Sequence, residues 1–418
     1  MSSPRRSTLA EYEARLAAYE LPEERRRASS YGRARTARPH APPRRDSRPR
    51  RPAPGRLLLR RVTALVLSVG FAWLAISYAS AMLAPSNVGF GVRSVEWLRD
   101  HGLAWLVSDV ESVYYSLNAP SKGGPALRAL PHVGVGASTA NGAYEPPPIP
   151  AAIRPALPGE GEWRRAGPLV AGAPPLLVTT FRPDPSYPQL VAGVAWMDRS
   201  RTAVQLYPGR YEPPAGSARG PMEVPPQLRQ SLVATFNSGF KLEDSGGGFA
   251  ALGHVYAPLR DGVATLVGNR DGSVDVRAWT GGPQPGPDVA FARQNLALIV
   301  DGGRLNPNLS DGPEWGATLG NAVRVWRSGV GVDSGGNLLY AAANTQTVSS
   351  LAQILLRAGA VRAMELDINY EWVSFNSYSA WGADGPAKLL PGMDRAATRY
   401  LTPDDRDFVG VFARSAAG

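Results

Sequence analysis

The sequence predicts an α+β fold: a large mixed β-sheet domain with few helices, preceded by a disordered tail and one transmembrane helix. Three observations lead to this expectation. Excess positive charge is confined to the N-terminal end, a long uncharged apolar run follows it, and short β-rich segments then alternate with turn signals along most of the remaining chain.

The N-terminal tail carries the excess positive charge of the chain. Residues 1–61 contain 17 arginines, no lysine and 6 acidic residues, a net charge of +11, whereas the rest of the 418-residue chain has 28 basic and 29 acidic side chains. The tail is rich in proline and poor in apolar residues after Tyr31, so it is predicted to be disordered. We interpret its charge as a topology signal rather than a nucleic-acid site, with recruitment of cytoplasmic partners as a weaker alternative.

A transmembrane helix is predicted next. Val62–Ala84 is a run of 23 residues without a charge, long enough at 1.5 Å per residue to cross a hydrocarbon core of about 30 Å. Arginines abut its N-terminal end, so the positive-inside rule places residues 1–61 in the cytoplasm and the chain after residue 85 outside. The sequence thus predicts a single-pass cell-membrane protein with an extracytoplasmic C-terminal domain. Cleavage as a signal peptide at Ala79-Ser80-Ala81 is the alternative.

Residue usage excludes several kinds of site. The chain has no cysteine, so it can form neither a disulfide nor a zinc–thiolate site, and it has no thiol chemistry. Its four histidines, at positions 40, 101, 132 and 254, are too scattered for a zinc-binding motif. No metal site and no cofactor are predicted, and any metal would have oxygen ligands.

Three regions are expected after the membrane segment. Residues 85–118 have apolar residues at helical spacing, interrupted at Gly102, and predict a juxtamembrane amphipathic helix that lies either at the interface or against the main domain. Residues 119–160 are rich in Pro, Gly and Ala and predict an extended linker. Residues 161–418 then form one extracytoplasmic domain, long enough for a sizeable core.

Strands dominate the expected domain. Asp261-Gly262 and Asp271-Gly272 are strong hairpin signals, and Ser334-Gly335-Gly336-Asn337 predicts a further turn. The β-rich segments are 176–181, 191–198, 202–207, 231–236, 263–267, 274–279, 296–300, 329–333 and 338–343.

One helix and the strand after it form the centre of the predicted domain. Apolar residues at helical spacing predict a helix over 348–358, with Thr347 or Ser349 as its N-cap and Gly359 ending it. The period then changes to two, which places Glu365, Asp367 and Asn369 on one face of a strand. Acidic groups there need a water-filled cleft or cationic partners, although a strand whose second face meets solvent is the simpler alternative.

Four segments, taken in their order along the chain, resemble the motifs of a known family. They are Phe236-Asn237-Ser238-Gly239-Phe240, Val300-Asp301-Gly302, Arg327-Ser328-Gly329-Val330-Gly331-Val332-Asp333 and Leu366-Asp367-Ile368-Asn369-Tyr370-Glu371. Over residues 230–370 this order resembles the phosphodiester glycosidase family, typified by N-acetylglucosamine-1-phosphodiester alpha-N-acetylglucosaminidase. The resemblance implies a hydrolase that cleaves sugars linked through phosphodiesters.

The chemistry of such a reaction suggests roles for the candidate acidic residues and for Arg327. A carboxylate stabilises the oxocarbenium-like transition state, while cations or N–H donors hold the departing phosphate. Asp367 fits the carboxylate, with Glu365 and Asp301 competing for a partner role, and Arg327 fits the phosphate because a guanidinium grips two oxygens. The nucleophile, base and stabiliser are not distinguished. The candidate catalytic residues are Asp367, Arg327, Asp301 and Glu365, and the candidate substrate-binding residues are Asn237, Gly239, Gly302, Asn369, His254 and Arg324.

Several candidates have structural alternatives. Asp301 before Gly302 is also a common turn pair, Asn237 is also a turn residue, and a lone histidine such as His254 is more often structural. The last segment departs from the family, since Ile368, Asn369 and Tyr370 stand where glycines would let backbone N–H groups approach a phosphate.

Two functional hypotheses follow. The first is a membrane-anchored hydrolase acting on a sugar-1-phosphodiester bond in cell-envelope glycopolymers or exopolysaccharide, with the carbohydrate substrate and the membrane as its partners. The second is a non-catalytic glycan-binding or envelope-assembly protein that retains the fold.

Overall fold

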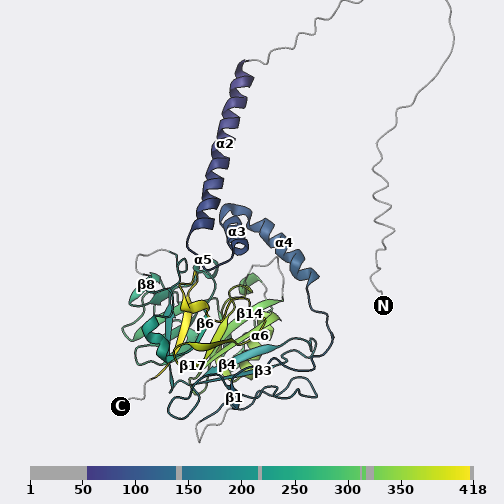
Figure 1. The fold of residues 1–418 in the computed structure, drawn as a ribbon, viewed down its shortest axis with the longest axis vertical. Helices are drawn as coiled ribbons and strands as arrows, with labels where there is room; N and C mark the ends of the chain where they lie inside the picture. The colour runs from purple at the N-terminus through teal and green to yellow at the C-terminus, as the bar shows by residue number, and fades with distance from the viewer. Residues whose placement is uncertain (1–53, 138–143, 215–218, 311–312, 317–323, 415–418) are drawn as a thin grey trace, which may run out of the picture. The chain divides into compact units, whose positions relative to one another are not determined.

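A computed structural model of the chain describes residues 54–137, 144–214, 219–310, 313–316 and 324–414. The predicted disordered tail lies almost entirely in residues 1–53, outside the described residues. The chain divides into two compact units, Met1–Ser68 and Val69–Gly418. The second unit holds all the sheets, and it confirms the predicted α+β class with few helices (Figure 1).

The first described helix, α2, spans Pro54–Leu83. Its apolar part, Leu58–Leu83, has 26 residues with a mean hydropathy of 1.9 and is long and apolar enough to cross a membrane. None of its most apolar stretch is buried. The helix thus includes the predicted span 62–84 except for the last residue.

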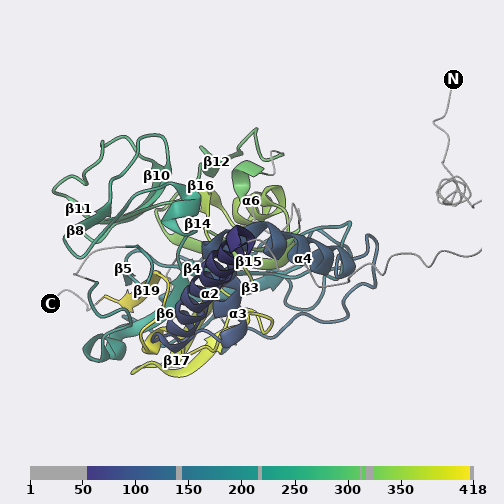
Figure 2. The same ribbon diagram turned by 90° about the horizontal axis from the view of Figure 1, so that it is seen from above.

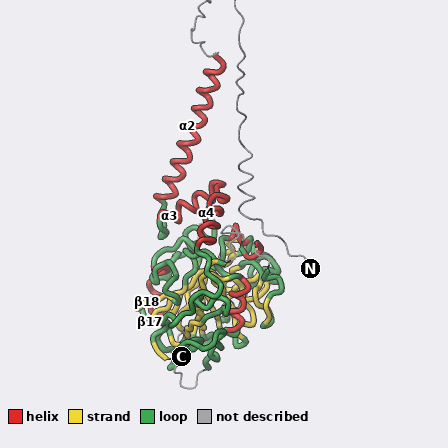
Figure 3. The backbone as a smooth tube through the Cα atoms, turned by 90° about the vertical axis from the view of Figure 1, so that its right-hand side faces the viewer, coloured by secondary structure: helices red, strands yellow, loops and turns green. Residues whose placement is uncertain are grey.

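The predicted juxtamembrane helix consists of two helices. α3 spans Phe90–Leu98 and α4 spans Ala104–Leu117, and the π-helical turn η1, Arg99–Leu103, joins them. Helical geometry breaks inside this turn at His101 and at Gly102, whose φ of 81° lies in the left-handed region that favours glycine. Figures 1 and 3 show α3 and α4 at one end of the β-structure.

The largest sheet has nine strands, all paired antiparallel. In spatial order they are β1 (Gly136–Ala137), β2 (Arg164–Arg165), β3 (Leu176–Phe181), β4 (Ala192–Met197), β15 (Leu338–Gln346), β14 (Val325–Asp333), β16 (Ala360–Glu365), β12 (Leu298–Asp301) and β13 (Arg304–Leu305).

Two five-stranded antiparallel sheets complete the β-structure. One has the order β10 (Val274–Ala278), β9 (Ala264–Asn269), β11 (Val289–Gln294), β7 (Phe249–Ala251) and β8 (His254–Ala257). The other has the order β18 (Asp384–Lys388), β17 (Phe375–Ala380), β6 (Leu232–Asn237), β19 (Phe408–Ala413) and β5 (Thr202–Tyr207). Short helical turns lie at α5 (Leu242–Ser245), η2 (Pro226–Ser231), η3 (Pro313–Trp315) and η4 (Arg399–Leu401).

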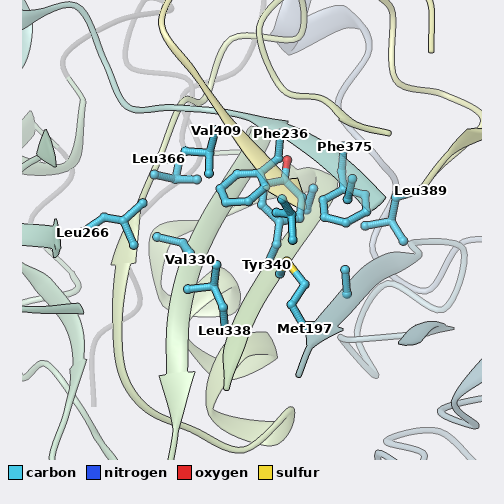
Figure 4. Close-up of a cluster of buried hydrophobic side chains, with 14 of the residues drawn as sticks. Met197, Phe236, Leu266, Val330, Leu338, Tyr340, Leu366, Phe375, Leu389 and Val409 are labelled. Carbon is cyan, nitrogen blue, oxygen red and sulfur yellow. The ribbon is translucent and has the colours of Figure 1, made fainter. Parts of the chain in front are cut away.

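Helix α6, Val348–Arg357, covers one face of the nine-stranded sheet (Figure 2). Its buried residues Leu351 and Leu355 pack with Leu339 and Ala341 of β15. The opposite face packs against the two smaller sheets. There Tyr340 meets Phe236 and Phe375 of the β6–β17 sheet, and Leu266 of the β9 sheet joins the same cluster (Figure 4). Strands β3, β4 and β14 of the nine-stranded sheet are therefore buried on both faces.

The predicted helix and strand in the centre are present. Thr347 and Ser350 form a capping box, with Thr347 Oγ1 accepting from the Ser350 N–H at 3.0 Å, and Gly359 ends the helix with a φ of 99°. β16 follows directly. Asp271-Gly272 forms the turn between β9 and β10, as predicted, whereas Asp261-Gly262 precedes β9 and joins no hairpin of adjacent strands.

Part of the expected linker packs on the domain. Val133 and Ile149 belong to the two large hydrophobic clusters, and β1 pairs with β2. Glu160 is buried and accepts from Arg182 Nη2 at 2.7 Å. Residues 144–160 have no regular secondary structure, yet their side chains contribute to the core.

Candidate active site

The candidate site forms where the antiparallel strands β14 and β16 pair. Gly329 of β14 pairs with Glu365 of β16, and backbone pairing continues past the end of β16. The Leu366 N–H donates to the Ser328 carbonyl at 2.8 Å, and the Ser328 N–H donates to the backbone carbonyl of Asp367 at 3.1 Å. These bonds hold residues 365–367 in extended geometry beyond the strand. They place Arg327, Glu365 and Asp367 together.

Glu365 and Arg327 form a buried ion pair. Arg327 Nη1 lies 2.5 Å from Glu365 Oε1, and Arg327 Nε donates to the carbonyl of Gln346 at 3.0 Å. Burial raises the pKa of the Glu365 carboxyl to about 7, and Arg327 offsets only part of this rise. Among the described residues, Glu365 Oε2 has no hydrogen-bond partner. Glu365 can therefore exchange a proton near neutral pH.

Of the two carboxylates Glu365 and Asp367, Asp367 is the one that lines a cavity. Its Oδ2 accepts from Arg406 Nη2 at 3.0 Å, and its Oδ1 accepts from the Asn369 N–H at 2.9 Å. Burial raises the pKa of Asp367, and Arg406 opposes that rise. Both side chains line a cavity of about 520 Å³, together with Asn369.

Arg406 is the main site residue that sequence reasoning missed. Besides Asp367, its Nη2 bonds the carbonyl of Gly239 at 3.1 Å, and its guanidinium lies 5.1 Å from the centre of the Trp372 ring. The available signal is its setting in Asp404-Asp405-Arg406-Asp407, just before β19. Asp404 and Asp407 each bind a buried arginine, at 399 and 293, so this acidic run organises arginines near the site.

The cavity has charged walls of both signs. A second cavity of about 410 Å³ shares six lining residues with the first, and these are Glu96, Asp100, Lys241, Glu243, Trp372 and Arg406. Lys241 Nζ lies 3.7 Å from Glu96 of α3 and 3.8 Å from Glu243. Residues of α3, η1 and α4 thus form one wall of the region around Asp367.

Asn237 and Gly239 lie beside the candidate site and hold neighbouring segments in place. Asn237 Oδ1 accepts from Tyr340 and from the Ser374 N–H, while its Nδ2 donates to Ser328 Oγ at 3.0 Å. The amide therefore braces the β6, β14 and β17 ends against one another. Gly239 approaches Asn295 so closely that a Cβ there would lie 3.1 Å from it.

Other candidates lie elsewhere. Asp301 is exposed in the turn between β12 and β13, and Gly303 of this turn donates to Val361, at the opposite end of β16 from Asp367. Asp301 and Gly302 therefore do not join Asp367. His254 is exposed on β8, an edge strand of another sheet.

Arg324 precedes β14 and is engaged away from the cavity wall. It lies 3.2 Å from Asp184 and 4.0 Å from the centre of the Tyr187 ring. Within the described part of the chain, no three His, Cys, Asp or Glu side chains come together as possible metal ligands.

No protein-family model matches the sequence, and no curated protein matches it. Among solved structures, the chain is similar to the zebrafish N-acetylglucosamine-1-phosphodiester alpha-N-acetylglucosaminidase catalytic domain, auto-inhibited by its pro-peptide. The identity is 17%, the TM-score is 0.39, and the match covers 60% of this chain and 87% of that one.

Two bacterial structures are also similar. A hypothetical protein from Synechocystis shares 12% identity with a TM-score of 0.35, covering 63% of this chain and 64% of that one. A protein of Burkholderia pseudomallei described as exported shares 11% identity with a TM-score of 0.31, covering 55% and 75%. These likenesses are distant and lie at the level of the fold.

Proposed function

We propose that the chain is a membrane-anchored hydrolase that cleaves a sugar-1-phosphodiester bond in cell-envelope polymers outside the cytoplasm. The observation that carries the proposal is the meeting of Asp367 and Arg406 at a cavity wall, with the Glu365–Arg327 pair joined to them through β14 and β16. A carboxylate and a guanidinium side by side suit a reaction that develops positive charge on a sugar and releases a phosphate.

The proposed roles follow from access to the cavity. Asp367 stabilises or attacks the anomeric carbon, and Arg406, with Lys241, binds the phosphate oxygens. The bond from C1 to the phosphate oxygen breaks, a water oxygen bonds to C1, and the phosphate departs as a monoester while the water's proton passes to solvent. Arg327 is less suited to the phosphate than the sequence suggested, because it lines neither of the two cavities, whereas Arg406 lines both.

Glu365 serves as the partner carboxyl in this proposal. With a pKa of about 7 it changes charge near neutral pH, and its carboxylate and that of Asp367 repel each other. Asp301 is less suited, since it lies in an exposed turn at the far end of β16.

In this proposal, α2 anchors the protein in the membrane. Its apolar part has the length and hydropathy of a membrane span, and Arg60 and Arg61 near its start favour an N-terminus in the cytoplasm. The sheet domain would then lie outside the cytoplasm, where envelope glycopolymers and exopolysaccharide are found.

The test is hydrolysis of a panel of sugar-1-phosphodiesters by the full chain in detergent, measured as released phosphomonoester and reducing sugar. Asp367→Asn should lower turnover by about 100-fold or more because it removes the carboxylate beside Arg406 at the cavity wall. Asp384→Asn is the matched control, since Asp384 is exposed on β18, and it should retain wild-type turnover.

Two results would overturn the proposal. One is equal turnover by the wild type and Asp367→Asn. The other is a folded wild-type chain that binds glycans but turns over no member of the panel, which would favour the non-catalytic alternative. Circular dichroism of each variant establishes that it is folded.

A further inference from the structure

An apolar stripe runs along the outer face of α4. Leu106, Val110, Val113 and Leu117 are separated by four, three and four residues, so they line one side of the helix, and they are 41%, 63%, 59% and 80% exposed. Other sides of the helix face the protein, where Val107 is buried and Tyr115 packs against the cluster of Phe240, Val325 and Ile368. The four side chains thus form an exposed apolar surface on α4.

The end of α3 and the turn η1 before α4 lie alongside the apolar helix α2 rather than beyond its end. Trp97 Nε1 donates to Ser77 Oγ at 3.0 Å, and His101 Nε2 shares a hydrogen bond of 2.9 Å with the same hydroxyl. The His101 ring is also 5.7 Å from the ring of Trp73. At about 1.5 Å per residue, Ser77 and Trp73 lie roughly 9 and 15 Å back from the last residue of α2.

We propose that α4 lies in the membrane–water interface and that its stripe of Leu106, Val110, Val113 and Leu117 contacts lipid. An interfacial helix buries its apolar face about 5–10 Å into the headgroup and acyl boundary, which matches the roughly 9 Å between the end of α2 and Ser77, the residue that His101 of η1 contacts. Trp105 and Tyr114, both exposed, are of the type enriched at membrane interfaces. The proposal rests on the membrane anchoring of α2 and not on the hydrolysis.

Lipid fits this surface better than a second copy of the chain. The stripe spans residues 106–117, fewer than two heptads, whereas a helical pair needs about three or four heptads of apolar contact to be stable. The charge of Glu111 is paired with Arg99 at 2.7 Å, so it does not oppose contact with an apolar phase.

The helices next to the membrane also line the candidate site. Glu96, Asp100 and Ser108 of α3, η1 and α4 line the cavity that also holds Asp367 and Arg406. Ala81 and Ala84, at the end of α2, line the neighbouring cavity. An interfacial α4 therefore holds this wall of the cavity at the membrane surface.

The absence of cysteine allows a direct test. An environment-sensitive nitrobenzoxadiazole label is attached in Val113→Cys and, separately, in Val110→Cys, and the full chain is reconstituted in phosphatidylethanolamine–phosphatidylglycerol vesicles. Including lipid with a nitroxide near the top of the acyl chain should quench both labels by about two-fold or more, because the nitroxide lies at the depth expected for the stripe. Asp384→Cys, on exposed β18, is the control and should stay unquenched.

Equal weak quenching at positions 110, 113 and 384 would overturn the proposal. A blue-shifted label that nitroxide lipid does not quench, and whose shift disappears as the protein is diluted in lipid, would assign the stripe to a second copy instead. Neither result depends on turnover, so failure of the proposed hydrolysis leaves this test unaffected.

Discussion

Arg406 Nη2 donates to Asp367 Oδ2 at 3.0 Å, although 39 residues separate the two side chains. Asp367 follows the strand β16 of the nine-stranded sheet, whereas Arg406 precedes β19 of a five-stranded sheet. The pair thus joins two sheets at the cavity wall. It neutralises a buried carboxylate and presents a guanidinium at the same place, two requirements of the proposed reaction.

Arg406→Met should destabilise the chain by about 3–5 kcal/mol, because it leaves the buried Asp367 carboxylate without a compensating charge. Adding Asp367→Asn should restore about 1–3 kcal/mol, since the coupling lies between these two groups. Urea unfolding of the full chain in detergent measures both values. The control cycle uses Arg229 and Glu223, a part-exposed pair, and should give a coupling below about 1 kcal/mol. Additive effects at 367 and 406 would contradict the prediction.

The pKa of Glu365 predicts a pH dependence of stability. Its folded-state pKa of about 7 lies above the ordinary value of 4.5, so the folded chain binds the proton more tightly than the unfolded chain. The resulting stabilisation is fully present below pH 4.5 and is lost as the pH rises to about 7, a change on the order of 3 kcal/mol.

Comparison with Glu365→Gln isolates this contribution. The difference in free energy of unfolding between the wild type and the variant should fall across the pH range from 4.5 to 7 and then stay level, as measured by denaturant titrations. A difference that is independent of pH would show that Glu365 titrates normally in the folded chain.

The centre of the domain was predictable because its signals are local. The change from helical period to period two at Gly359 marks the end of α6 and the start of β16, and both elements are present. The grouping of the candidate site was predictable in part, because Glu365, Asp367 and Asn369 come from one segment, and β14 brings Arg327 to them. Arg406 comes from a distant segment, and its place depends on how the sheets pack, which no local pattern encodes.

For the expected linker, the sequence did not predict the tertiary contacts. Proline-rich composition correctly indicates the absence of helices and strands in 144–160, but it carries no information on tertiary contacts. Ile149 is nonetheless buried, and its N–H donates to the Gly161 carbonyl at 2.9 Å. Asp301 shows that an Asp-Gly pair after an apolar strand fits a turn as well as a site, and the structure has the turn.

Gly329 lets α6 approach β14. A Cβ at this position would lie 2.9 Å from Leu355 Cδ1 and 3.0 Å from the Met364 carbonyl, so Gly329→Ala should destabilise the chain by about 1–3 kcal/mol. The matched control is Gly286→Ala, where an added Cβ meets nothing within 4 Å and φ is not positive, and it should change stability by less than about 1 kcal/mol. Equal midpoints of urea unfolding for the two variants would refute this account of the packing.

The buried pair of Glu160 and Arg182 should hold residues 144–160 on the domain. Arg182 Nε and Nη2 contact the two carboxylate oxygens of Glu160 at 3.0 and 2.7 Å, and Nη2 also donates to the Pro155 carbonyl at 2.8 Å. Glu160→Gln removes the charge from this site and leaves the buried guanidinium unpaired, at a cost of about 3–5 kcal/mol. Limited proteolysis should then cut within 144–160 faster than in the wild type.

Glu162→Gln is the matched control, because Glu162 is exposed two residues away, and its cleavage rate should equal that of the wild type. If both variants were cleaved at the wild-type rate, the ion pair would not be what fastens the segment, and its attachment would have to come from apolar contacts such as those of Ile149 and Trp163. Faster cleavage in Glu160→Gln alone would show that a segment with linker composition is held by one buried charge pair.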